Sequence, residues 1–335
     1  MAQDEATLGS AVSEPKLGSA LTDRAKMRKH RSLWGNAWQQ FKKHRLAMAG
    51  LTIFILLILI TFIGNQFYWR EYNHISIPDK NISPNSEFWL GTDNKGQDIL
   101  ARILWGGRIS IAVGICAAFV AILIGTLIGA SAGFFGGFTD SLLMRITDGF
   151  ICLPQLPLLL LISFLFKDPI KDFFDDRFPQ GIPFIFDDGA TLGIFVLIVV
   201  VISALAWMQT ARIVRASFLS AKEKEFTEAA RSIGANRSSI MFKHILPNVF
   251  SPIIVAATLE IGAAIISESA LSFLGLGFPS DVPTWGAMLN AAQPHFQIAP
   301  YQAIVPGFFI FLTVLSINYI GDGLRDALDP RKTLN

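Results

Sequence analysis

Six long apolar runs dominate this sequence, and each is long enough to cross a lipid bilayer. A spanning helix needs about 20 mostly apolar residues. The qualifying runs are 46–67, 109–133, 144–166, 190–208, 249–274 and 302–320. Their apolar residues are continuous and do not alternate, which excludes the strands of a membrane barrel. Because only 16% of the 335 residues are charged and 52% are hydrophobic, a soluble enzyme is also excluded. The sequence therefore predicts an all-α integral membrane protein with six transmembrane helices.

The distribution of Lys and Arg predicts how these helices are oriented. With the N-terminus inside, the cytoplasmic segments hold 20 of the 28 basic residues. The outer segments 68–108, 167–189 and 275–301 hold the other 8. Lys and Arg accumulate on the cytoplasmic side of membrane proteins. We therefore expect a multi-pass protein of the cytoplasmic membrane with both termini in the cytoplasm.

The six runs divide the chain into a tail, a first span with its interfacial helix, an outer loop and a core. Residues 1–32 are polar and predict a disordered cytoplasmic tail. Residues 33–67 predict an interfacial helix and the first transmembrane helix, with a plain extension of that first span as the alternative. Residues 68–108 are expected to form an extracytoplasmic loop, and 109–335 a five-helix core. Within that core, the acidic outer segment 167–189 predicts a loop, either a partner contact or a neutral insertion.

The cytoplasmic segment between the fourth and fifth runs predicts a helix–turn–helix. Helical patterns through 225–233 and 237–246 flank Gly234. Gly ends a helix in a left-handed cap without steric cost, and Pro247 is expected to stop the second helix. Such an element has little to bury by itself, so docking on another protein is the favoured interpretation. We expect this docking element to cover about residues 223–247, with a solvated connecting loop as the alternative.

These residues resemble a known motif. The run Glu228-Ala229-Ala230, then Gly234, and later Leu246-Pro247, is similar to the "EAA" motif of ABC importer permeases. In that family the motif forms the coupling helix, which sits in a cleft of the ATPase subunit. One position departs from the family pattern, because His244 stands where Ile is common.

Further segments extend the resemblance from Leu33 to Arg331. The stretches that resemble the C-type permease subunit of the peptide/nickel (oligopeptide/dipeptide) importer family are 90–110, 132–148, 271–277, 284–289 and 321–331. The resemblance implies a type I importer permease fold and the translocation of oligopeptides or dipeptides. It also implies a second, homologous permease, two ATPase subunits and an external solute-binding protein as partners. Nickel or another small solute of the same family is an alternative cargo, and a self-contained secondary transporter is the alternative from another class.

Ionisable side chains inside a span are costly and usually face a cavity or a partner. Glu260 and Glu268 lie in the fifth run, and Asn318 lies in the sixth. We expect all three to be candidates for the translocation path. A carboxylate hydrogen-bonded to a neighbouring helix is the alternative for both acids.

Catalytic motifs are absent from the sequence. It contains no GxxxxGK[ST] phosphate loop, no HExxH and no CxxC, and these are the patterns that bind nucleotide phosphates or metals. We therefore expect a non-catalytic subunit without a cofactor of its own, with ATP and Mg on the partner ATPases. A net charge of +2 gives no reason to expect a nucleic-acid partner.

Overall fold

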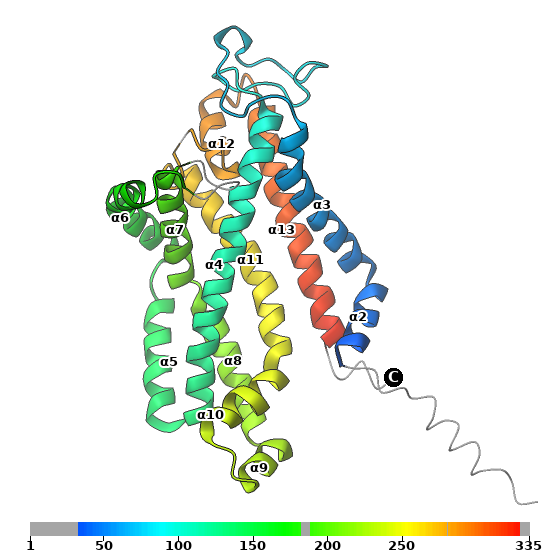
Figure 1. Ribbon diagram of the computed structural model, residues 1–335, viewed down its shortest axis with the longest axis vertical. Coiled ribbons are helices and arrows are strands. Elements are labelled where there is room, and N and C mark those ends of the chain that lie inside the picture. The colour runs from blue at the N-terminus through cyan, green and yellow to red at the C-terminus, as the bar shows by residue number, and fades with distance from the viewer. Residues whose placement is uncertain (1–32, 182–187, 280, 329–335) are drawn as a thin grey trace, which may run out of the picture.

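The computed structural model describes residues 33–181, 188–279 and 281–328. The tail expected over 1–32 lies outside the described residues. The described chain is built from helices, and one isolated bridge joins Thr92 to Asp98. The helices run along one long axis (Figure 1), with the irregular segment 68–98 at one end and α9 at the other. Their bounds are α2 (Leu33–Lys43), α3 (Arg45–Phe67), α4 (Ile99–Phe135), α5 (Gly137–Ile151), α6 (Gln155–Arg177), α7 (Gly189–Ala204), α8 (Trp207–Lys222), α9 (Glu225–Ser232), α10 (Arg237–Ser239), α11 (Phe250–Phe273), α12 (Trp285–Ala292) and α13 (Tyr301–Leu328).

Four of the described helical segments are long and apolar enough to cross a membrane alone: Arg45–Gly64, Ile99–Phe135, Arg237–Phe273 and Tyr301–Leu328. Two bent pairs pass the same test together, α5 with α6 at 84° and α7 with α8 at 45°. If each pair is one span, the described chain has six. The six expected spans match that count.

Pro154 and Pro157 in the expected third span predict a kink or a break, and the structure has a break there. Helix α5 ends at Ile151, and Pro154 is the N-cap of α6. Proline cannot continue the backbone hydrogen bonds of a helix, and it forces the preceding residue toward extended backbone. In Figure 1, α6 consequently turns away from the axis along which α5 runs.

Helix α6 corrects one expectation. Residues 167–177, expected to form part of an irregular outer loop, are helical. The reason lies in α7, where two glycines let the helices approach closely. A Cβ added at Gly189 would lie 2.6 Å from the backbone oxygen of Phe174, and one at Gly193 would lie 2.9 Å from that of Ile170. This packing gives the segment a helical partner that its acidic sequence does not reveal.

Helix α4 begins earlier than the expected second span. Asp98 is its N-cap, and the carboxylate accepts a hydrogen bond from the backbone N–H of Ala101 at 3.1 Å. The apolar residues 99–105 predict a short helix in the outer segment, but the structure joins them to the span expected from residue 109 in one helix of 37 residues. Arg108, which looks like a helix-end residue, is buried and donates to the backbone oxygens of Thr61 and Phe62.

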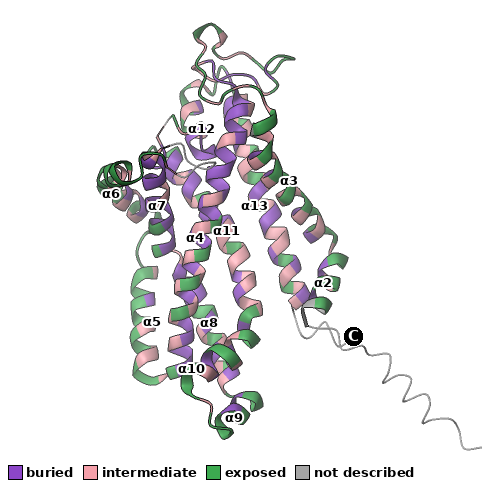
Figure 2. Cartoon of the chain, viewed as in Figure 1, coloured by how far each residue is buried: buried purple, intermediate pink, exposed green. Residues whose placement is uncertain are grey.

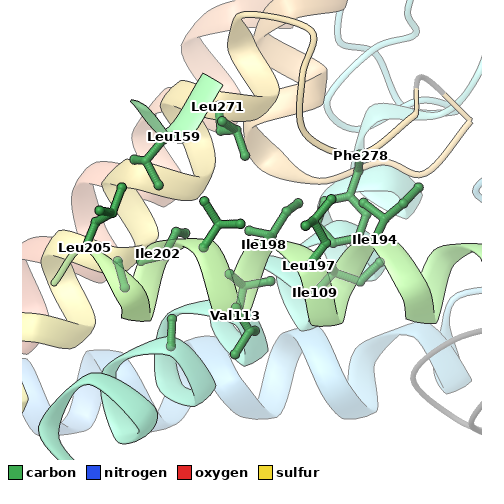
Figure 3. Packing of buried hydrophobic residues seen from close by; sticks show 14 of the residues in the cluster. Ile109, Val113, Leu159, Ile194, Leu197, Ile198, Ile202, Leu205, Leu271 and Phe278 are labelled. Atoms are coloured by element: carbon green, nitrogen blue, oxygen red, sulfur yellow. The ribbon is translucent and has the colours of Figure 1, made fainter. Parts of the chain in front are cut away.

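The main core lies between α4, α7 and α11. Figure 3 shows Ile109 and Val113 of α4 meeting Ile198 of α7, with Leu271 of α11 and Leu159 of α6 closing the cluster. Each of these side chains is almost completely buried. Burial of one such side chain contributes about 1.5–3 kcal/mol. The upper half of α4 is accordingly buried along much of its surface in Figure 2.

Helix α4 packs closely on α8, because glycines of α4 contact the α8 backbone. A Cβ added at Gly125 would lie 2.6 Å from the carbonyl oxygen of Trp207, and one at Gly133 would lie 2.7 Å from that of Arg215. Gly129 lies between them, against the carbonyl oxygen of Ala211. Small residues four apart let membrane helices approach until their backbones touch. We call these three glycines the α4 seam.

Both ends of the described chain lie at the α9 end of the bundle. Helix α2 packs on the last turns of α13, where Phe41 and Ala327 are buried together. Figure 1 shows α2 and the end of α13 side by side. This arrangement agrees with an even number of crossings.

A candidate coupling site and the membrane residues behind it

The turn after α9 has the geometry that its glycine predicted. Gly234 has a φ of 81°, in the left-handed region where side chains are strained. Its N–H donates to the oxygen of Arg231 at 2.9 Å, and the N–H of Ala235 donates to the oxygen of Ala230 at 3.1 Å. These two bonds form the Schellman motif that closes a helix. A Cβ at Gly234 would meet no other atom within 4 Å.

The second half of the element differs from expectation. Pro247 does not stop a helix, because the chain stays helical from α10 into α11. A π-helix, Ile240–Ile245, and a 3-10 helix, Leu246–Val249, carry it past the proline. In the π-helix the N–H of Leu246 donates to the oxygen of Met241, five residues earlier. The altered winding removes the need for the N–H that Pro247 lacks.

One face of α9 is anchored in the protein. Ala230 is buried in a cluster with Ile245 of the π-helix, Phe218 of α8 and Phe134 of α4. The hydroxyl of Thr227 is also buried and donates to the backbone oxygen of Ala221 at 2.9 Å. The position of α9 is therefore fixed relative to α4 and α8.

The opposite face of α9 is exposed. Glu228 and Ala229 point away from the cluster, and Ile233 is 81% exposed at the tip of the turn. Leu246 is half-buried and Pro247 is exposed at the base of the element. An isolated exposed apolar side chain needs no explanation, but this one lies beside the open Gly234 on a rigidly held turn. We call Glu228, Ala229, Ile233 and Gly234 the coupling surface.

Two ion pairs connect α8 to α5 above this surface. Arg215 donates from Nε and Nη2 to the carboxylate of Asp140, and Nη2 lies 2.6 Å from Oδ2. Arg212 donates to Asp148 at 2.5 Å. From the sequence alone, Asp140 at the start of the helix is expected to cap α5, and Asp148 is expected to pair with Arg145 one turn away. Both expectations were wrong, because α5 has no side-chain cap and the α8 guanidinium groups reach these acids across the helix pair.

The three polar candidates of the membrane segment lie in different surroundings. Glu268 is completely buried, and its carboxylate accepts a hydrogen bond from Ser272 at 2.9 Å. Ser110 of α4 and Thr284 at the start of α12 also interact with the carboxylate, which thus connects α11 to both elements. Glu260 and Asn318 are half-buried. The Asn318 side chain of α13 lies near Gly262 of α11.

Comparison with known proteins identifies the family. The family described as the binding-protein-dependent transport system inner membrane component matches residues 121–334, well over half of the chain. The N-terminal transmembrane domain of oligopeptide transport permease C matches residues 32–84. The chain belongs to the permease C branch of the binding-protein-dependent ABC transporters. It is thus a non-catalytic, multi-pass component of the inner membrane, and a transporter of this kind works with an ATPase and a binding protein.

Individual relatives resemble this permease over nearly its whole length. The oligopeptide transport system permease protein OppC of Bacillus subtilis is 35% identical, over 95% of this chain and 96% of its own. OppC of Haemophilus influenzae is 38% identical, over 90% and 89%. The glutathione transport system permease protein GsiD of Pectobacterium atrosepticum is also 38% identical, over 90% and 92%. A solved amino acid ABC transporter aligns with a TM-score of 0.44 at 18% identity, over 64% of this chain and 89% of its own, which is too distant to carry an argument.

The outer end of the permease carries a folded cap that the sequence did not reveal. Tyr301 of α13 donates to the backbone oxygen of Ile82, and Gln302 donates to the side chain of Asn81. Tyr68 donates to Asp98 at 2.8 Å and joins the other side of the segment to the start of α4. The turn-forming residues of 68–98 gave no signal for these partners, which are more than 200 positions away in α13.

Proposed function

We propose that this permease is one of two homologous membrane subunits of an importer for peptides. Oligopeptides and glutathione are the substrates in the names of its relatives, and both are peptides. Their shared chemistry supports a peptide cargo delivered by an external binding protein. The single observation that carries the mechanism is the coupling surface, which is exposed on one side and anchored in the core on the other.

The coupling surface is the proposed contact with one of two ATPase subunits. An ATPase cleft takes Glu228, Ala229 and Ile233, while Gly234 keeps the tip narrow. Because α9 is packed against α8, and α8 is in backbone contact with α4, a displacement of α9 moves these helices together. ATP and Mg belong to the ATPases, and the permease contributes the docking shape and the mechanical connection.

The translocation path is proposed between this chain and its homologous partner. Glu260 and Asn318 are the candidates in this chain, because both remain partly accessible. Glu268 was a third candidate from the sequence. Its complete burial and its hydrogen bonds within the chain favour a structural role, in which the carboxylate joins three helices.

Substitution of Gly234 tests the proposal. Gly234→Leu introduces a side chain with a left-handed backbone, which costs roughly 1 kcal/mol or more, and adds bulk to the docking surface. We expect the complex to lose its ATPases and its solute-stimulated ATP hydrolysis while the six spans remain inserted. Glu228→Ala should weaken coupling less, because it removes one charge-assisted contact and leaves the shape.

The matched control is Gly275→Leu. Gly275 has a φ of 82° and, like Gly234, has no atom within 4 Å of an added Cβ, but it follows α11 at the opposite end of the bundle. It should retain the ATPases on a pull-down. If Gly234→Leu also retains them and transports normally, the segment is only a connector. Uptake of a labelled tripeptide against a nickel chelate by the reconstituted importer tests the cargo, and uptake of nickel alone contradicts the peptide assignment.

A further inference from the structure

A basic pocket lies beside the coupling surface, at the predicted cytoplasmic end. It has a volume of about 420 Å³ and is lined by Phe134, Phe135, Lys222, Arg231, Ala235, Arg237 and Ile240. The two phenylalanines end α4, Lys222 ends α8, and the arginines come from α9 and α10. The pocket therefore lies where four helices meet.

The charge of this pocket is of one sign. Three of its lining residues are cations and none is an acid. Within the described residues, no salt bridge engages Lys222, Arg231 or Arg237. The Lys222 ammonium lies 4.0 Å from where a Cβ would be at Gly136, so it reaches over the turn between α4 and α5. By contrast, nearby Arg212 and Arg215 both have carboxylate partners. The pocket concentrates positive charge that the chain does not neutralise.

Part of the pocket's lining is apolar. Phe134 is almost completely buried, whereas Phe135 is 50% exposed. Exposed side chains continue from there along α5 at four-residue spacing, through Phe138, Leu142 and Ile146. A phosphate group bound by the cations would thus lie near a row of exposed apolar side chains. The acyl chains of a lipid can contact such a row, whereas a soluble phosphate has no apolar part that could do so.

Arg231 lies on the flank of α9, between the anchored face and the coupling surface. It follows the buried Thr227 by four residues and the exposed Glu228 by three, so both are its neighbours on the helix. Ala229, on the coupling surface, lies on the opposite side of α9 from Arg231. The pocket therefore adjoins the coupling surface, and retention of the ATPases by a pocket variant separates the two roles.

We propose that this pocket binds the phosphate head group of an anionic phospholipid from the inner leaflet. Lys222, Arg231 and Arg237 hold the phosphate, and Phe135 with the α5 strip contacts the acyl chains. Basic residues near a membrane surface favour anionic lipid by roughly a fivefold change in affinity per charge. A lipid held here lies against both the α4–α5 turn and α9.

The test uses the whole transporter, with its partner permease and ATPases, in nanodiscs of phosphatidylcholine with or without phosphatidylglycerol. Native mass spectrometry after mild delipidation measures the phosphatidylglycerol that stays bound. We expect the wild-type complex to retain it and a variant with Lys222→Gln, Arg231→Gln and Arg237→Gln to lose it. The charge-conserving pair Arg231→Lys and Arg237→Lys should keep most of it.

A second triple variant controls for net charge. Lys42, Lys43 and Lys243 are exposed cations that do not line the pocket, and their change to Gln should leave retention unchanged. Equal retention by both triple variants overturns the proposal. Loss of the ATPases from the pocket variant in phosphatidylcholine also overturns it, because the cations would then belong to the ATPase contact. Full displacement by inorganic phosphate would assign the site to a soluble anion. The ATPase pull-down of the Gly234 variant is a separate readout, so failure of the lipid site leaves the coupling proposal standing.

Discussion

Arg215 of α8 donates two parallel hydrogen bonds to Asp140 of α5, although the two residues are 75 positions apart. Two-point guanidinium–carboxylate pairs fix direction as well as distance. This pair holds the broken third span to the helix that leads into α9. It also explains why α5 stays beside α8 even though α6 turns away.

Asp140→Asn should therefore loosen α5. Both side chains are partly exposed, so the expected loss of stability is modest, about 1 kcal/mol. Arg215→Gln should cost a similar amount, and the double variant little more than either alone. A thermal-unfolding double-mutant cycle on the purified complex measures this coupling. Strictly additive losses would show that the pair contributes nothing.

The α4 seam makes a sharper prediction. Gly129→Ala adds a methyl group against the backbone oxygen of Ala211, where no flexible side chain can yield. We expect a loss of about 1–3 kcal/mol from overpacking, seen as a lower thermal midpoint and a lower yield of complex. Gly149→Ala is the matched control, because nothing lies within 4 Å of the added Cβ in α5. Equal behaviour of the two variants would contradict backbone contact at the seam.

The outer cap should lose stability at high pH. Burial, and then the hydrogen bond to Asp98 and its negative charge, raise the pKa of Tyr68 above its ordinary value of 10. The folded cap thus holds a proton that the unfolded chain releases. Its stabilisation is complete below pH 10 and is lost as the pH rises from 10 toward the higher folded pKa. Limited proteolysis within 68–98 should accelerate over that range in the wild type, and Tyr68→Phe should remove this part of the pH dependence.

Glu268 and Glu260 should respond differently to substitution. Glu268→Ala leaves hydroxyl groups without their acceptor and opens a cavity, so we expect a loss of about 2–4 kcal/mol and little recovered complex. Glu268→Gln keeps the volume and one acceptor, and should assemble. Glu260→Gln, on the same helix, should assemble normally but transport less. Normal uptake by Glu260→Gln would remove Glu260 from the path.

The sequence was most informative where one residue type has one physical consequence. Continuous apolar runs predicted the spans, Pro154 predicted the broken helix, and Gly234 predicted a left-handed turn. Each of these signals is local. The family resemblance, carried by short motifs such as Glu228-Ala229-Ala230, was confirmed by the comparisons.

Tertiary partners account for what sequence reasoning missed. The carboxylate of Asp140 can either cap α5 or pair with Arg215 of α8. No residue in 140–148 indicates that it pairs with Arg215. Likewise, Gly189 and Gly193 keep residues 167–177 helical by letting α6 approach α7. The four-residue spacing of Gly125, Gly129 and Gly133, and of Gly189 and Gly193, is a signal that could have predicted these contacts, since small residues at that spacing indicate close helix packing.

The α4 seam also affects how a conformational change at one end of the bundle reaches the other end. Helix α4 is 37 residues long, and its N-cap, Asp98, accepts a hydrogen bond from Tyr68 of the outer cap. Its other end packs against α8 through the α4 seam, and α8 packs in turn against α9. A helix changes little in length, because its backbone hydrogen bonds fix a rise of about 1.5 Å per residue, so a shift of one end along the helix axis also moves the other end. We therefore expect the two ends of α4, at the outer cap and beside the coupling surface, to move together.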